Sequence, residues 1–345
     1  NGSYAVVVTA FDGVGLSAPG TVFVQLANGG PAASAVALSD ADGVLNAADT
    51  LNASLADTSQ NITAVEYFVD VLGSAGTGTA MSAADGVFDS HTEPVTAAFP
   101  VLALAEGKHN VYVRGKNIAG EWGETGTLAF IVDTRPPVIK NVSVEYVSSK
   151  AAAKKGDLAL ITAIVEDGGV GLDSASVVLG SNNLDGTTHI MKDDGANGDK
   201  VRGDNVFSYL AASTAGGNGA KPFTIGASDI VPNASNAVTG SVLLDNEAPV
   251  FSSLIVQAPD DDIYRNGETV KLLAVFDKAG YAVKGDFSAL DSVSGAPVLA
   301  LDNGDNSYSL AYTISENNRI ANGSYQVVVT AVDGVDLSAE ATLAL

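Results

Sequence analysis

Asn1-Gly-Ser-Tyr-Ala-Val-Val-Val-Thr-Ala-Phe-Asp-Gly-Val-Gly-Leu-Ser-Ala18 opens the chain, and a close copy of this stretch stands near its end. The copy is Asn322-Gly-Ser-Tyr-Gln-Val-Val-Val-Thr-Ala-Val-Asp-Gly-Val-Asp-Leu-Ser-Ala339, at a constant offset of 321 residues. Repetition at a fixed offset is typical of an array of modules. We therefore expect the chain to begin with the last two strands of one module and to end with the same strands of a later copy. It would then be about one period of a longer repetitive polypeptide.

The same local pattern occurs in further passages, where an alternating strand ends in Asp or Asn and leads into a turn. These passages are His109–Asn117, Phe223–Asp229 and Tyr325–Asp333. Alternation with period two places every second residue, such as Val111 and Val113, on the buried face of a strand. The terminal Asp or Asn can accept hydrogen bonds from backbone amides of the turn. Together with the opening stretch, the pattern predicts three whole modules and a fragment.

Proline-containing junctions separate the predicted modules. They are Leu26-Ala-Asn-Gly-Gly-Pro31, Ile131-Val-Asp-Thr-Arg-Pro-Pro137 and Leu244-Asp-Asn-Glu-Ala-Pro-Val250. Proline fixes its own φ and extends the residue before it, so these segments predict short, stiff connectors. The expected domains are a closing strand pair at 1–30 and three sandwiches, here called the first, second and third modules, at 31–135, 136–248 and 249–345.

Composition and strand spacing indicate the fold class. Hydrophobic residues make up 46% of the 345 residues and aromatic residues only 6%, a balance that suits short strands better than helical bundles. Alternating stretches such as Val138–Tyr146, Ala175–Leu179 and Thr269–Phe276 predict six or seven short strands per module of about 100 residues, as in immunoglobulin-like sandwiches. We predict an all-β chain of tandem Ig-like or FnIII-like β-sandwich domains in a rod-like array.

The charge balance bears on partners and location. Lys and Arg number 17 against 40 Asp and Glu, a formal net charge of −23, so the basic face that nucleic acid binding requires is not expected. The acidity suits a salty exterior or divalent cations. The chain has no cysteine and no run of about 18 apolar residues, so we expect neither disulfides nor a membrane-spanning segment. An extracellular, cell-surface location fits these features.

A family resemblance rests on the aromatic-x-Val-x-Val-x-Ala-x-Asp/Asn strand and its Gly-bearing turn. This pattern resembles the penultimate strand of fibronectin-III-like and related bacterial and archaeal immunoglobulin-like domains. Further passages resemble such modules in archaeal surface-layer and sheath-type proteins: Glu66–Asp70, Asp85–Asp89, Gly120–Gly123, Ile190–Asp199 and Leu301–Tyr308. The resemblance covers the whole chain and implies the sandwich fold. It leaves adhesion, scaffolding and enzyme-appendage roles open, because the sandwich hosts all of them.

The strongest metal-binding pattern is Asp193-Asp-Gly-Ala-Asn-Gly-Asp-Lys-Val-Arg-Gly-Asp204. Asp193, Asn197, Asp199 and Asp204 alternate with glycines and can wrap oxygen ligands around a hard cation such as calcium. The loop departs from an EF-hand, because Gly195 stands at position three and an Asp stands where a Glu is expected. The alternative is an acidic hairpin held by Asx turns.

A shorter acidic loop contains Asp302 and Asp305, and we treat these as a second candidate calcium pair. Calcium in either loop is expected to stiffen the loop and to play no catalytic part. No other cofactor is expected.

Glycosylation is the second kind of modification that the sequence suggests. An exported chain carries Asn-x-Ser/Thr acceptors on its surface, although the frequency of Asn, Ser and Thr here yields several by chance. The candidates are Asn1, Asn52, Asn61, Asn141, Asn233 and Asn322.

The histidines and the tryptophan are expected to pack. His91, His109 and His189 lack metal-like spacing, and His109 takes the position of Tyr4 in the repeated strand. Trp122 is expected to cover one end of the first module, with sugar stacking as the alternative. No Gly-x-Ser-x-Gly, Walker loop, His-Glu-x-x-His or cysteine nucleophile occurs, so we predict that the chain is not an enzyme.

These patterns together favour an extracellular structural protein, a repeat unit of a surface layer, sheath or filament that assembles with copies of itself. The alternative is a cell-surface adhesin or a carbohydrate-binding appendage of a secreted protein. A strand pair at residues 1–28 leaves Tyr4, Val6 and Val8 without a sandwich to cover them. We expect either sequence outside this chain to cover them or a neighbouring subunit to take them by strand addition.

Overall fold

The computed structural model describes residues 2–26, 29–180, 183–214, 216–258, 263–293 and 295–345. Its regular structure is strands apart from three short 3₁₀ helices, which are η1 (Val101–Ala103), η2 (Ser174–Ser176) and η3 (Ser288–Leu290). None of the described helices is long or apolar enough to cross a membrane. The all-β prediction is confirmed.

The first module forms one sheet that folds over on itself. Its strands are β3 (Ala32–Leu38), β4 (Val44–Leu45), β5 (Asp49–Ala56), β6 (Ile62–Val69), β7 (Thr79–Ala83), β8 (Thr92–Phe99), β9 (Gly107–Asn117) and β10 (Gly126–Val132). They are hydrogen-bonded in the order β3-β5-β8-β7-β6-β9-β10-β4. β7 connects the two layers, because Met81 pairs with Val65 of β6 while Ser82 pairs with Thr96 of β8.

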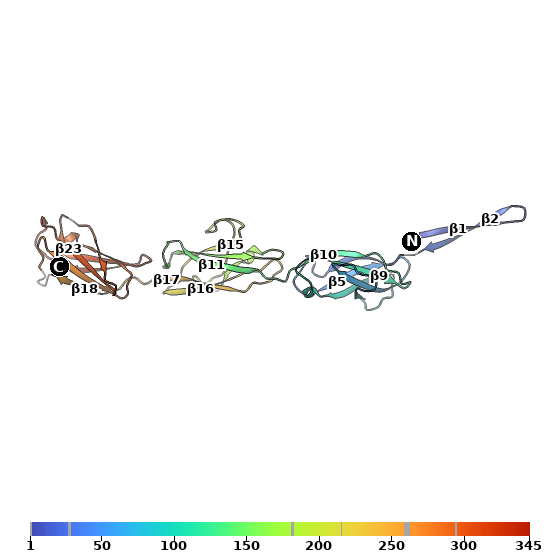
Figure 1. Cartoon of the computed structure of the whole chain (residues 1–345), viewed down its shortest axis with the longest axis horizontal. Coiled ribbons are helices and arrows are strands. Elements are labelled where there is room, and N and C mark those ends of the chain that lie inside the picture. Colours follow the sequence, from blue (N-terminus) through green and yellow to red (C-terminus); the bar gives the residue numbers. More distant parts are fainter. Residues whose placement is uncertain (1, 27–28, 181–182, 215, 259–262, 294) are drawn as a thin grey trace. The chain divides into compact units, whose positions relative to one another are not determined.

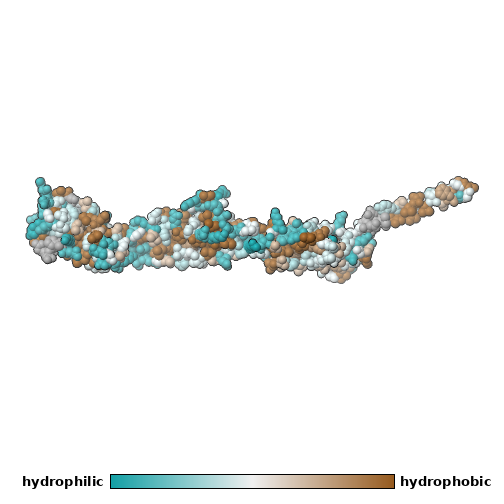
Figure 2. All heavy atoms as spheres, viewed as in Figure 1, coloured by the Kyte–Doolittle hydropathy of each residue, from teal (hydrophilic) through white to brown (hydrophobic). Residues whose placement is uncertain are grey.

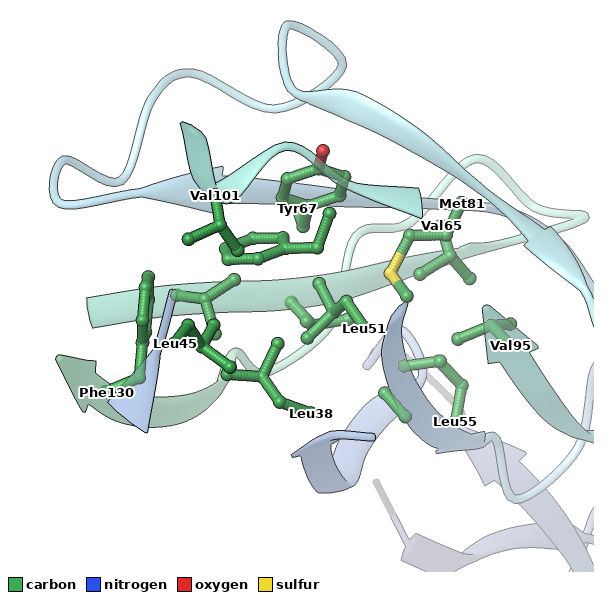
Figure 3. Close-up of a cluster of buried hydrophobic side chains, with 14 of the residues drawn as sticks. Leu38, Leu45, Leu51, Leu55, Val65, Tyr67, Met81, Val95, Val101 and Phe130 are labelled. Carbon is green, nitrogen blue, oxygen red and sulfur yellow. The ribbon is translucent and has the colours of Figure 1, made fainter. Parts of the chain in front are cut away.

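Alternating side chains fill the space between the layers of the first module. Leu51 and Leu55 of β5 are fully buried, and Figure 3 shows them among Val95, Tyr67 and Phe130 from other strands. Burying a side chain of this size stabilises a fold by roughly 1.5–3 kcal/mol. The first module therefore has a core of its own.

The second and third modules each contain two sheets. In the second module, one sheet contains β11 (Val138–Tyr146), β12 (Leu158–Glu166) and β15 (Val206–Ala212) in that order. The other sheet contains, in order, β14 (His189–Ile190), β13 (Val178–Gly180), β16 (Gly219–Gly226) and β17 (Val238–Leu244). In the third module, one sheet contains, in order, β18 (Phe251–Ala258), β19 (Thr269–Phe276), β23 (Ser307–Thr313) and β22 (Leu301–Asp302). The other sheet contains, in order, β21 (Val298–Leu299), β20 (Ala282–Asp286), β24 (Gln326–Val332) and β25 (Ser338–Ala344). Ile161 and Phe223 are buried in the second module, and Leu272 and Tyr308 in the third.

By compactness the chain divides into two units. The first unit is Asn1–Pro137 with the loops Asp167–Asp173 and Ser228–Ala234. The second unit is Val138–Glu166, Ser174–Ala227 and Ser235–Leu345. The expected rod-like arrangement stays a prediction.

The repeated stretch forms the same hairpin in both places. β1 (Gly2–Phe11) pairs with β2 (Ser17–Leu26) in the register in which β24 pairs with β25: Ala5 lies opposite Phe23, and Gln326 opposite Ala344. The β1–β2 hairpin is a two-stranded sheet by itself, seen as a ribbon in Figure 1 and lined by apolar residues in Figure 2. The equivalent hairpin of the third module is part of a four-stranded sheet.

The turn after each copy of the repeated strand is closed by its terminal Asp or Asn, as predicted. Asp12 Oδ1 accepts the amides of Val14 and Leu16 at 3.0 and 2.9 Å. Asp333 Oδ1 accepts the amides of Val335 and Leu337 at 2.9 Å each. Satisfying these turn amides fixes the direction in which the next strand returns.

Candidate metal centre

Three aspartates from distant parts of the chain meet within the first unit. Asp133 directly follows β10, Asp167 directly follows β12, and Asp229 lies in the loop after β16. One carboxylate oxygen of each lies within 4.8 Å of the other two. We call Asp133, Asp167 and Asp229 the junction acids.

Backbone amides hold each junction carboxylate in place. Asp167 Oδ2 accepts the amides of Gly169 and Gly171 at 3.0 and 2.9 Å. Asp133 Oδ2 accepts the Val170 amide at 2.7 Å, so the loop after β12 folds over Asp133. The carboxylates are therefore oriented by the chain before any ligand arrives.

Burial makes this arrangement electrostatically costly. Asp133 has no exposed surface and Asp229 only 3%, and none of the junction acids forms an ion pair with a side chain that the structure describes. At an effective dielectric constant of about 20, two unit charges 4.8 Å apart repel by about 3 kcal/mol. Asp167 Oδ1 is buried and has no hydrogen-bond partner among the described atoms. A cation would supply both the missing partner and the missing charge.

The backbone leaves room beside these carboxylates because residue 169 is glycine. A Cβ at Gly169 would lie 1.9 Å from Asp133 Oδ2. Any side chain at this position would collide with the carboxylate, so the close approach of the loop depends on the glycine.

Aspartates also stand in the corresponding places after the last strand of the second module and after two strands of the third, and there a lysine is added. Asp245, Asp277 and Asp333 follow β17, β19 and β24. Lys278 Nζ lies 3.9 Å from Asp245 Oδ2, and the Tyr281 hydroxyl donates to Asp277 Oδ1 at 2.9 Å.

The nearby acids also affect the pKa of Tyr281. Burial, followed by the hydrogen bond to Asp277 and the charges of Asp277, Asp333 and Asp245, raises the pKa of Tyr281 well above its usual range. Gly168 stands immediately after Asp167, in the place that Lys278 takes after Asp277. The third module thus carries its own cation where the junction acids have none among the described side chains.

The glycine-rich loop predicted to bind calcium also gathers carboxylates. Asp193, Asp199 and Asp204 each place an oxygen within 4.8 Å of the other two. Asp199 is buried, Asp193 half-buried and Asp204 exposed. The Val201 amide donates to Asp199 Oδ1 at 3.2 Å and the Val206 amide to Asp204 Oδ1 at 3.0 Å, and both bonds are Asx turns. The loop therefore combines the Asx turns expected of an acidic hairpin with the clustered carboxylates expected of a calcium site.

The remaining predicted ligands are Asn197, in the same loop, and the pair Asp302 and Asp305. Asn197 is exposed and has a positive φ of 52°. Asp302 Oδ1 accepts the Gly304 amide at 2.8 Å, and Asp305 Oδ1 accepts the Ser307 amide at 3.2 Å. The hydrogen bonds from Ser307 lower the pKa of Asp305. No third acid or histidine joins Asp302 and Asp305 in the described part of the chain.

The glycosylation candidates differ in exposure. Asn1 lies outside the described residues. Asn141 is exposed at a bulge in β11, and Asn322 is exposed before β24. Asn52 and Asn61 are half-buried, and the Asn61 amide donates to the Asp89 carbonyl at 2.7 Å.

Asn233 lies beside the junction acids and is hydrogen-bonded to two of them. Its side-chain amide donates to Asp229 Oδ2 at 2.7 Å and to the Asp133 carbonyl at 3.0 Å. A glycan on this nitrogen would replace one of the two hydrogen bonds, so a structural role competes with the glycosylation candidate.

His109 packs as expected from its place in the repeat. Its ring is buried against Phe130, with centroids 5.5 Å apart. Nδ1 lies 2.8 Å from Asp70 Oδ2 and Nε2 lies 2.8 Å from the Ala105 carbonyl oxygen. Burial opposes a charge on the ring, but these two hydrogen bonds raise the pKa of His109.

Trp122 takes part in a stack on the first module. The Arg114 guanidinium carbon lies 4.9 Å from the Phe68 ring centre and 5.5 Å from that of Trp122. Arg114 Nε also donates to the buried Glu66 carboxylate at 2.7 Å. The exposed indole face that sugar stacking needs is thus partly taken up by Arg114.

The comparisons with known proteins assign neither a family nor a function to this chain. No protein-family model and no curated protein matches the chain. One solved structure, described as giving insight into host cell surface retention of a 1.5-MDa bacterial ice-binding adhesin, is 17% identical, with 91% of this chain and 95% of that chain covered and a TM-score of 0.47.

Two further solved structures are tandem modules. A tetra-tandem repeat from the extending region of a large adhesion protein is 18% identical, with 100% of this chain and 81% of that chain covered and a TM-score of 0.32. Fibronectin(III)-like modules of Clostridium thermocellum CbhA are 15% identical over 61% of this chain and 94% of theirs, with a TM-score of 0.28. With TM-scores of 0.47, 0.32 and 0.28, these likenesses carry neither a fold assignment nor a function to this chain.

Proposed function

We propose that this chain is an extracellular structural protein, a repeat unit of a surface layer, sheath or filament built from Ig-like modules. The observation that carries the proposal is the recurrence of one closing hairpin, with the same register and the same Asp-closed turn, at both ends of the chain. Modules that repeat a closing element are suited to serial addition, because each has its own core and contacts its neighbours.

Charge and connectors support a load-bearing role outside the cell. The net charge of −23 keeps such a chain soluble before assembly. Arg135, Pro136 and Pro137 stand between β10 and β11, and this short proline-containing connector limits the freedom between consecutive sheets.

Calcium would stabilise such a protein at the junction acids. Asp133, Asp167 and Asp229 supply carboxylate oxygens, which are the ligands that calcium prefers. The ion would join three chain segments that are far apart in sequence, and so it would oppose their separation under load. The loop with Asp193, Asp199 and Asp204 is the second candidate position.

Sedimentation of the purified chain over a range of protein and calcium concentrations tests the structural role. We expect reversible assembly into large species of uniform geometry at high protein concentration. A chain that stays monomeric under all conditions, and that binds defined sugars on a glycan array, would contradict the structural role and support the adhesin alternative.

A further inference from the structure

The two copies of the closing hairpin agree at the positions that matter for packing. In the third module the inward residues Val327, Val329 and Ala331 are fully buried, and Asp333 and Val335 are nearly so. The residues at the same positions of the β1–β2 hairpin are Val6, Val8, Ala10, Asp12 and Val14, identical in type at every place.

The differences between the copies lie elsewhere. Of 24 aligned positions 16 are identical, and the 8 differences include none of these inward positions of the first strand. On the second strand, the half-buried Leu343 and Leu345 correspond to Val22 and Val24, which are also aliphatic. The β1–β2 hairpin therefore presents the inner face of a closing hairpin.

This inner face has no cover in the described part of the chain. Val6 is 47% exposed, Val8 61% and Val14 85%. The outer edge of β1 also has no strand partner there, because the hairpin is a two-stranded sheet. In the third module the corresponding edge of β24 is paired with β20, with Ala331 opposite Val283.

We propose that the β1–β2 hairpin is a docking element that completes an unfinished Ig-like sandwich of the third-module type. The partner is a strand set with the apolar face that residues 249–321 present to their own hairpin, formed by side chains such as Leu272, Phe276 and Leu310. The β1 edge pairs with the partner's counterpart of β20, and Val6, Val8 and Val14 enter its core. This association extends a sheet and fills a core at the same time.

The matching inward residues favour an unfinished sandwich of the third-module type as the partner over a general apolar surface. A surface that merely needs apolar cover does not require Asp12 to be kept in the position of Asp333, nor the same hairpin register. An intact copy of this chain is not the partner, because its place is already filled by residues 322–345, which act at high effective concentration. The inference holds for an adhesin as well as for a scaffold, so it does not rest on the proposed function.

A graft within the full chain tests the fit directly. Residues 322–345 are replaced by the sequence of residues 1–24 through these changes: Gln326→Ala, Val332→Phe, Asp336→Gly, Glu340→Pro, Ala341→Gly, Leu343→Val, Ala344→Phe and Leu345→Val. We expect β19, β20 and β23 to keep their hydrogen-exchange protection, with a melting temperature within about 8 °C of the parent chain. Loss of protection in these strands would overturn the proposal.

A truncation then tests docking between molecules. A chain ending at Ala321 has an unfinished third module and a free hairpin, so one molecule can complete the next. A single head-to-tail contact of this kind produces open chains. At a protein concentration below that at which the parent chain of 345 residues assembles, we expect sedimentation to show species that grow in steps of one truncated chain, while the parent chain shows none.

Matched substitutions distinguish docking through the inward face from nonspecific association. Val8→Asp places a charge on the inward face and should abolish the association, whereas Val7→Asp lies on the opposite face and should leave it within about threefold. Removing residues 1–26 from the truncated chain should also abolish it. A truncated chain that stays monomeric, or that associates equally with both substitutions, would overturn the proposal.

Discussion

Val8 and Val329 hold the same position in two copies of one hairpin, yet Val8 is 61% exposed and Val329 has no exposed surface. Each lies in the first strand of its hairpin, four positions before the Asp that closes the turn. The local structure is the same, so the difference in burial comes entirely from the strands that surround Val329. Comparing the two valines therefore distinguishes the structure that the hairpin forms by itself from the burial that the other strands of a module provide.

Truncation of the two valines should have very different costs. Val329→Ala leaves a cavity in the third module and should lower its free energy of unfolding by about 2 kcal/mol. Val8→Ala removes an exposed side chain and should change stability by less than about 0.5 kcal/mol. Hydrogen exchange followed by mass spectrometry, peptide by peptide, measures both. Equal losses in the two variants would mean that Val8 is covered in solution.

Calcium should raise the melting temperature of the first unit through the junction acids. A bound ligand stabilises a fold by about 2.7 kcal/mol when its concentration is 100 times its Kd. Asp167→Asn removes one charge and one ligand atom, so it should remove most of the calcium-induced shift in differential scanning calorimetry. Gly169→Ala should do the same by pushing the loop away from Asp133.

Two further variants control for general effects on charge. Gly168→Lys places an ammonium group where the third module has Lys278, and it should stabilise the chain without calcium while abolishing the calcium response. Asp277→Asn should leave the calcium response of the first unit unchanged. A calcium shift that survives Asp167→Asn and Gly168→Lys would assign the effect to another site, with the loop of Asp193, Asp199 and Asp204 as the next candidate.

Arg114 should be essential for the order around Trp122. Arg114→Met leaves the Glu66 carboxylate buried without its cation, although the Gly76 and Gly78 amides still donate to it. Breaking a buried ion pair in this way costs about 3 kcal/mol. Unfolding of the first module can be followed by fluorescence, because Trp122 is the only tryptophan of the chain.

A double variant tests the cause of that loss. Glu66→Gln added to Arg114→Met removes the uncompensated charge and should recover part of the stability. If the double variant is as unstable as the sum of the single variants, lost packing on Phe68 and Trp122 is the cause instead.

The Asp70–His109 pair should make the first module pH-sensitive. The pKa of His109 is raised in the folded state, so its contribution is complete below the unfolded value near about 6.5 and is lost as the pH rises through the folded value. The pKa of Asp70 is lowered, chiefly by the hydrogen bond with His109, so its contribution is lost at the acidic end.

Asp70→Asn should therefore reduce stability by about 0.5 kcal/mol at about pH 5 and by less at about pH 9, because the Asp70 side chain is 47% exposed and solvent screens its charge. Urea titrations at the two pH values measure the difference. His109→Gln is the control, since it should remove the pH dependence of the Asp70→Asn effect. An equal loss at both pH values would show that the Asp70 bond to the Asn110 amide, and not the charge, matters.

Period-two alternation predicted the strands that bury one face. Thr269–Phe276 has the expected bounds, and every second side chain in it is buried. Val138–Tyr146 also has the expected bounds, although its inward side chains are only half-buried. β4 and β7 were missed, since Val44–Leu45 is very short and Thr79–Ala83 is set by pairing with two other strands. The strand expected over Ala175–Leu179 was partly wrong, because its first residues lie in η2.

The acidic loop of residues 193–204 could be found in the sequence because its members are close together. The junction acids could not be found in that way, since Asp133, Asp167 and Asp229 are brought together only by the meeting of strand ends. A weak signal existed: an Asp also follows the last strand of the second module, at Asp245, and two strands of the third, at Asp277 and Asp333. Three acids at matching strand ends indicate a shared edge of the sandwich, but not the distance between carboxylates.

Electron microscopy of the native cell-surface material, labelled with an antibody against the third module, tests the structural role most directly. We predict label at regular intervals along a lattice, tube or fibre, with one interval per repeat of the chain. Label on separate molecules without a periodic arrangement would contradict it, and the binding of sugars and other ligands would then become the function to explain.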